Sequence, residues 1–314
     1  MLFLKDILNR DDDFKSLSQA VEKDELPIVC SGLSAIHKAL FAYALNRETG
    51  KKFTIITPDE ASAIALRDDL LSLGANAVYL PQRDYNFNNL GHSKDYERAR
   101  INTLSKLLGG DFELLILSLG SALLYTLPPD ELKKATVKIG AGDTLDMGNF
   151  CETLVSGGYA ASEIVEGPGQ FSRRGNIIDV FSPSDNQPLR IELWGDEIDS
   201  ISHFDVTSQR RGDTLETTTI YPANELSFNR EFLIKNLHKY LSSRKKLTDS
   251  QRKSIENDLD ALKNDLPVFQ DRYIKFLYEA PATIFDYICD TDIIMCEWGN
   301  IKERLKTAYD IEAQ

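Results

Sequence analysis

Two arginines and a tryptophan stand where exposed side chains could bind another protein. Arg174 comes just before a glycine, Arg190 opens an apolar stretch, and Trp194 follows four residues later. The Arg-Gly pair at 174–175 and the Gly-Asp-Glu at 195–197 are expected to form turns between strands. Residues four apart on a strand share a face, so Arg190 and Trp194 are expected to point the same way. Arginine forms bidentate, charge-assisted bonds with carboxylates, and both residue types are enriched at the energetic centres of interfaces. On the residues alone, solvated arginines and a tryptophan that caps a small core explain the pattern equally well.

A second group of residues follows the pattern of a phosphate-binding loop with parts missing. A P-loop reads Gly-x-x-x-x-Gly-Lys-Ser/Thr, because the glycines let backbone amides surround the phosphates, the lysine neutralises them and the hydroxyl reaches magnesium. Here Gly32 and Lys38 are in place, but His37 replaces the second glycine and Ala39 has no oxygen for a metal. We therefore expect phosphate binding to fail here, and the plain alternative is an ordinary end of a strand and start of a helix.

Alternating apolar and helical stretches indicate the elements that position these residues. Strands are expected at 27–30, 53–57, 77–80 and 114–118, with helices near 34–46, 60–73 and 94–108. This alternation is typical of a parallel sheet covered by helices. The sequence predicts an α/β fold, a degenerate P-loop sheet with helices, together with a small inserted α+β domain.

Breaks in the pattern divide the chain into three predicted domains. The first, residues 1–127, is the α/β sheet domain. The second, residues 128–213, has a strand at 136–139, a helix near 147–156, and then the strands that carry the arginines. The third, residues 214–314, is helical from 229 to 278 and ends in a strand at 292–296.

Composition excludes several classes of function. The 314 residues are 42% hydrophobic, yet no apolar run approaches the roughly 20 residues that a membrane helix needs, so no membrane partner is expected. The 49 acidic against 36 basic residues give a formal charge of -13, so a nucleic-acid surface would be a local exception. The four cysteines lack paired CxxC spacing, which favours reduced thiols, no metal site and a cytoplasmic protein.

The stretch around the arginines closely resembles the small inserted domain of UvrB and of the bacterial transcription-repair coupling factors (Mfd). In those families an Arg-Gly-x-x-x-Asp-x-Phe-x-Pro strand precedes an Arg-x-Glu-Phe-Phe-Gly-Asp-Glu-Ile strand, and residues 174–183 and 190–198 match them here. The likeness continues through 203–210 and 221–225, which favours Mfd, and upstream through 81–87 and 96–108. It therefore runs over most of the chain.

The resemblance implies a docking role for the inserted domain. In both families this domain binds UvrA, the damage-recognition ATPase, and the matching positions here are Arg174, Arg190 and Trp194. Ser172 stands where a further basic residue would be, and Arg173 is expected to compensate in part. Trp194 replaces the usual phenylalanine, so the partner would need a wider apolar slot.

The resemblance also implies that the nucleotide site has decayed into a scaffold. The strand that completes it in UvrB ends in Asp-Glu, whereas this chain has Cys296 and Glu297. Cys296 thus replaces the aspartate that organises the metal. A residual nucleotide-dependent enzyme would require Lys38 and Glu297 to meet in one pocket, and it is the first alternative function.

The whole resemblance implies a non-catalytic adaptor module of transcription-coupled nucleotide excision repair that recruits UvrA to stalled RNA polymerase. The three predicted domains then correspond to UvrB-like domains 1a, 2 and 1b. RNA polymerase, DNA, ATP and magnesium would belong to other domains of the intact protein, a DNA translocase, and this module would need no cofactor.

A DNA-binding module is the second alternative. It would use Tyr85, Phe87 and Tyr96 to stack on bases, or the short basic run at 244–246 to contact phosphates. Aromatic residues at this density more often pack a loop against the core, and a short basic run is most simply a solvated face. Such binding would weaken steeply with salt.

Overall fold

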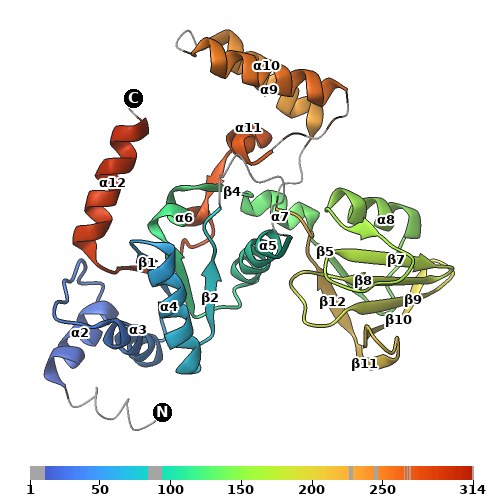
Figure 1. Ribbon diagram of the computed structural model, residues 1–314. Helices are drawn as coiled ribbons and strands as arrows, with labels where there is room; N and C mark the ends of the chain where they lie inside the picture. The colour runs from blue at the N-terminus through green and yellow to red at the C-terminus, as the bar shows by residue number, and fades with distance from the viewer. Residues whose placement is uncertain are drawn as a thin grey trace. The chain divides into compact units, whose positions relative to one another are not determined.

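The computed structural model describes residues 11–83, 94–225, 229–243, 247–264, 266, 268 and 270–312. The chain divides into two compact units, shown in Figure 1. Unit 1 comprises Met1–Asp84, Lys106–Leu124 and Tyr287–Gln314, and unit 2 comprises Tyr85–Ser105 and Tyr125–Asp286. The predicted α/β class with an additional antiparallel sheet is confirmed, while the division into domains 1–127, 128–213 and 214–314 stays a prediction.

A four-stranded parallel sheet lies at the centre of unit 1. Its order is β14-β1-β3-β2, with β1 at Phe53–Thr57, β2 at Ala77–Leu80, β3 at Leu114–Ser118 and β14 at Asp292–Met295. Every residue of β1 and β3 is buried, as expected of central parallel strands covered on both faces. The predicted returning strand near the end of the chain is therefore β14.

The helices of unit 1 are α2 (Asp12–Glu22), α3 (Ala35–Thr49), α4 (Glu60–Ser72), α6 (Leu119–Leu123) and α12 (Trp298–Glu312), while α5 (Lys94–Gly109) contributes residues to both units. Three helices, α3, α4 and α5, begin close to where the sequence places them, and α2, α6 and α12 were not predicted. The side chain of Asp59 accepts a hydrogen bond from the backbone N–H of Ser62 and so caps the start of α4.

The strand predicted at 27–30 is wrong. Pro27–Cys30 have no regular secondary structure and are exposed, with Val29 at 91% of its full accessibility. The prediction rested on a short apolar run, but a strand needs a partner as well as a propensity. Both edges of β1 are already occupied, one by β3 and the other by β14.

A six-stranded sheet with one helical layer is the main element of unit 2. Its order is β11-β10-β9-β8-β7-β6, and every pair is antiparallel except β6 with β7. The strands are β6 (Ala160–Ala161), β7 (Gln170–Arg174), β8 (Ile177–Phe181), β9 (Leu189–Trp194), β10 (Glu197–Phe204) and β11 (Arg211–Leu215). The predicted helix, α8 (Met147–Ser156), buries Phe150 and Leu154 in a core with Ile178, Val180 and Ile191 of the sheet.

Two tight hairpins fix the pairing of the strands that carry Arg174, Arg190 and Trp194. Arg174 pairs with Ile177 around Gly175, and Trp194 pairs with Glu197 around Gly195. Both glycines have positive φ, 60° and 64°, which two-residue hairpin turns require. The breaks that the sequence predicts after Arg174 and Trp194 are therefore confirmed.

The rest of unit 2 contains two short sheets and the predicted helical region. β5 (Val137–Gly140) pairs with β12 (Thr217–Ile220), and β4 (Tyr125–Thr126) pairs with β13 (Ala282–Thr283). The helical elements are α7 (Pro129–Ala135), α9 (Arg230–Ser243), α10 (Asp249–Lys263), η1 (Gln270–Tyr273), α11 (Ile274–Leu277) and η2 (Ile284–Asp286). Among the described helices of the chain, none combines the length and apolar character needed to cross a membrane.

Candidate protein-docking site

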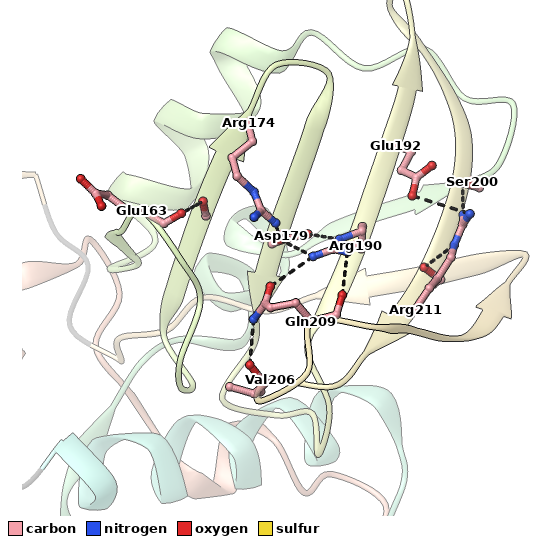
Figure 2. Close-up of polar contacts among 11 residues, drawn as sticks. Glu163, Arg174, Asp179, Arg190, Glu192, Ser200, Val206, Gln209 and Arg211 are labelled. Atoms are coloured by element: carbon pink, nitrogen blue, oxygen red, sulfur yellow. Dashed lines mark hydrogen bonds and ion pairs between the residues drawn. The ribbon is translucent and has the colours of Figure 1, made fainter.

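The two predicted arginines converge on one buried carboxylate. Arg174 Nη2 donates to Asp179 Oδ2 at 2.5 Å, and Arg190 donates from Nε and Nη2 to Asp179 Oδ1 and Oδ2 at 2.7 and 2.9 Å. Asp179 lies on β8 between β7 and β9, as Figure 2 shows, and its side chain is 1% exposed. One carboxylate therefore fixes both guanidinium groups relative to the sheet.

Arg190 also contacts Gln209 and Phe204 through its guanidinium. Its Nη1 donates to the backbone oxygen of Gln209 at 3.2 Å, and its guanidinium lies 4.5 Å from the centre of the buried Phe204 ring. The hydrogen bond to Asp179 raises the pKa of Arg190 above its ordinary value. Only 13% of the Arg190 side chain is exposed, against 44% for Arg174. Arg190 is thus mostly an internal support, and Arg174 is the more accessible cation.

The arginines and the tryptophan lie on the face of the sheet opposite α8, which we call the outer face. Burial along β9 alternates, with Leu189, Ile191 and Leu193 in the core, so Arg190 and Trp194 point the other way, as predicted. Trp194 is 84% exposed, so it does not cap a core within the chain. An exposed tryptophan beside a fixed, partly exposed arginine has the composition of an interface centre.

Arg173 and Ser172 are placed differently from the other predicted contacts. Arg173 is exposed but pairs with the core residue Ile178, and its charge acts on Cys151 of α8, so it lies on the α8 face. Ser172 is 2% exposed, and its hydroxyl donates to the backbone oxygen of Glu163 at 2.8 Å. A longer basic side chain at position 172 would break this contact, and a contact role for Arg173 stays a prediction.

Asp179 is the aspartate of the Arg-Gly-x-x-x-Asp-x-Phe-x-Pro strand, and its role as the common partner of the two arginines was not predicted. The available signal was its spacing: in a two-residue hairpin closed by Arg174 and Ile177, Asp179 is five residues from Arg174 and directly opposite Arg190 on the next strand. Gln209 could not be found this way, because it reaches Arg190 from a turn with a left-handed backbone, φ 57°.

Two residues of the predicted degenerate nucleotide site, Lys38 and Glu297, form an ion pair. Lys38 Nζ bonds to Glu297 Oε1 across 259 positions of sequence. Ala39 is fully buried in the core of unit 1, whereas His37 is exposed and its Nδ1 lies 3.2 Å from Ser34 Oγ. The lysine that would meet a phosphate already has a carboxylate partner.

A pocket of about 930 Å³ surrounds this ion pair in unit 1. Gly32 lines it with φ 81°, and Cys296, which is buried, lines it from the end of β14. Burial raises the pKa of the Cys296 thiol, so this group is a poor metal ligand near neutral pH. The remaining lining is mainly apolar, from residues such as Leu26, Ile28, Val29, Phe41 and Ile294.

Other candidate chemistry is sparse in the described part of the chain. Within it, no group of three or more His, Cys, Asp or Glu side chains is arranged to hold a metal ion. Tyr96 is half-buried and hydrogen-bonds to Arg100, which fits a packing role. Tyr85, Phe87 and the basic run at 244–246 lie outside the described residues. None of the four cysteines, all of which lie within the described residues, forms a disulfide.

Comparison with known proteins identifies the class of domain that carries the arginines. Residues 137–226 match the family model of the UvrB interaction domain, a range that includes the six-stranded sheet and α8. Unit 2 therefore contains a UvrB interaction domain.

Nearly the whole chain is similar to transcription-repair-coupling factors. The chain is 29% identical to the transcription-repair-coupling factor of Bacillus subtilis over 99% of the chain. It is 30% identical to that of Staphylococcus aureus over 96% of the chain. The protein of Staphylococcus haemolyticus is 29% identical over 97% of the chain. These similarities support the predicted resemblance of the chain to a UvrB-like module of the transcription-repair-coupling-factor type. The chain spans about a quarter of those relatives, 28% of the first and 27% of the other two.

Proposed function

We propose that this chain is a non-catalytic adaptor module that binds UvrA through the outer face of its UvrB interaction domain. The carrying observation is the pair Arg174 and Arg190, fixed on Asp179, on the same face of the sheet as the exposed Trp194. We call Arg174, Arg190 and Trp194 the docking face. A fixed guanidinium loses little conformational entropy when it binds a carboxylate, and the tryptophan adds apolar area next to it.

The docking face is a local exception in an acidic protein. The formal charge of the chain is -13, whereas the cluster of Arg174, Arg190 and Asp179 has two cations and one anion. A net positive cluster with an adjacent indole suits a partner surface with carboxylates around an apolar slot. By resemblance that partner is UvrA, and the role of the intact protein would be to bring UvrA to stalled RNA polymerase. DNA translocation, ATP and magnesium would belong to other parts of that protein.

The first prediction tests this function by calorimetry with the cognate UvrA. Arg174→Ala and Trp194→Ala should each weaken binding by about 2 kcal/mol or more, because each removes an exposed contact at the centre of the interface. Lys138→Ala is the matched control, since Lys138 is exposed on β5, outside the six-stranded sheet, and removes one positive charge. Circular dichroism must show that all variants are folded.

A folded wild-type chain that does not bind UvrA would refute the proposed function. Equal binding by wild type, Arg174→Ala and Trp194→Ala would refute the placement of the docking face. Arg190→Ala is less informative, because Arg190 is largely internal and its loss would strand the buried Asp179.

A residual nucleotide-binding function is the alternative that one observation favours, since Lys38 and Glu297 do meet in a pocket. The charges that line the pocket argue against nucleotide binding. The charged residues that line the pocket are one lysine and two carboxylates, Asp292 and Glu297, which would repel a triphosphate. Ala39 is buried and has no hydroxyl for magnesium.

The second prediction is therefore that ATP with magnesium does not bind measurably at millimolar concentration in an equilibrium titration. Glu297→Gln provides the internal comparison, because it releases the charge of Lys38. Tight binding to the wild type that is lost in Lys38→Ala would contradict the adaptor assignment for unit 1.

A further inference from the structure

A third arginine, Arg211 on β11, lies on the same outer face. Its Nε donates to Ser202 Oγ at 3.0 Å, and its Nη2 also donates to Ser200 Oγ, as Figure 2 shows for Ser200. Ser202 is directly opposite Arg190 in the pairing of β9 and β10. Residues directly opposite one another on neighbouring strands share a face. A polar row therefore crosses the sheet from Arg174 through Asp179, Arg190 and Ser202 to Arg211.

The surroundings of Arg211 leave its charge more available than that of Arg190. Two of its contacts are to neutral hydroxyls, and its nearest ionic contact, Nη1 to Glu192 Oε1, is 3.6 Å long. Its side chain is 44% exposed, the same fraction as Arg174, whereas Arg190 is 13% exposed. The serine hydroxyls hold the guanidinium in place without neutralising it, as a contact residue requires.

We propose that Arg211 is a further contact residue of the docking face, which binds a carboxylate on the same partner that meets Arg174 and Trp194. Arg190 then has the positioning role, because it links the two exposed cations through Asp179 on one side and stands opposite Ser202 on the other. The partner surface must carry acidic groups across the width of the five strands from β7 to β11. This inference rests on the proposed function, since it extends the same surface.

Association kinetics with UvrA at low and physiological salt test the proposal through two substitutions. Arg211→Gln can still bond to the serine hydroxyls but has no charge, and we expect it to weaken binding about fivefold, mainly by slower association. Arg211→Lys retains the charge and should associate within about twofold of the wild-type rate, because steering depends on charge rather than on the guanidinium fork. Lys138→Gln controls for the loss of one positive charge elsewhere in unit 2.

The outcomes separate this proposal from the proposed function. Wild-type affinity in Arg211→Gln, together with lost binding in Arg174→Ala and Trp194→Ala, would overturn the role of Arg211 and leave the docking face intact. An equal loss in Arg211→Gln and Lys138→Gln would overturn it too, because the effect would then be one of overall charge. Absence of wild-type binding would overturn both. If Arg211→Gln does not fold, the association rate of Arg211→Lys is the deciding measurement. An Arg211→Lys chain that associates with UvrA as slowly as Arg174→Ala does would overturn the proposal.

Discussion

Asp179 is the residue on which the arrangement of the outer face depends. A single buried carboxylate accepts hydrogen bonds from two arginines on two neighbouring strands. Such a group is stable only because its negative charge is fully hydrogen-bonded. The contact residues are accessible, but the residue that aligns them is not.

The third prediction concerns the stability of this cluster. Asp179→Asn should lower the free energy of unfolding by about 2 kcal/mol, because it leaves the mostly buried guanidinium of Arg190 without its counter-charge. Asp199→Asn is the control, since Asp199 is exposed on β10 of the same sheet. Urea unfolding measures both variants. No difference between them would mean that Arg190 is held by Gln209 and Phe204 alone.

At the scale of elements, the two hairpins and the α10 helix show how local sequence decides local structure. Glycines at the turns set the register of β7 with β8 and of β9 with β10. Helix α10 begins with a complete capping box, in which Thr248 Oγ1 accepts from Gln251 N at 3.2 Å and Gln251 Oε1 accepts from Thr248 N at 3.0 Å. The capping box gives hydrogen-bond partners to two backbone N–H groups at the start of α10 that would otherwise lack them.

The fourth prediction is that Thr248→Ala destabilises the start of α10 by about 1 kcal/mol, because both reciprocal bonds are lost or weakened. Hydrogen exchange of the amides at 250–253 should accelerate accordingly. Thr307→Ala is the control, since the hydroxyl of Thr307 bonds only within α12, to the backbone oxygen of Glu303. Unchanged exchange in Thr248→Ala would show that packing against α9 holds this end of the helix.

At the scale of the whole molecule, unit 2 is tied together by a buried ion pair between distant segments. Arg100 of α5 donates to Glu225 at 2.6 and 3.0 Å, and Thr126 donates to the same carboxylate at 2.6 Å. Both charged side chains are 1% exposed. The hydroxyl of Tyr278 adds a bond to the backbone oxygen of Glu225. Four segments of unit 2, including the one that carries Glu225, therefore meet at this residue.

The fifth prediction is that Glu225→Gln destabilises unit 2 by about 3 kcal/mol, because it removes the negative charge that pairs with the buried guanidinium of Arg100. Glu131→Gln should change stability by less than about 0.5 kcal/mol, since the Glu131–Lys134 pair is exposed. Hydrogen exchange in β8 and β9 during urea unfolding reports on unit 2 separately from unit 1. A loss no larger than that of Glu131→Gln would show that apolar packing alone holds these segments.

Much of the fold and of the candidate site followed from the sequence by itself. Periodicity placed the strands β1, β2, β3, β5 and β14 and the helices α3, α4, α5 and α8 within a few residues, since burial on one or both faces leaves a local apolar pattern. The spacing of Arg190 and Trp194 predicted their common face, and the Arg-Gly and Gly-Asp-Glu turns predicted the hairpins. These features depend on neighbours within about ten residues, which a sequence displays directly.

Only the tertiary structure decided which distant groups meet. The run at 27–30 has strand-like residues, yet it pairs with none of the described strands, and β14 from the other end of the chain is the strand that lies beside β1. The structure also pairs Lys38 with Glu297 and places Arg211 beside Ser202. Sequence patterns record whether a side chain is buried but not what it is buried against, so the partners of charged groups appear only once the chain has folded.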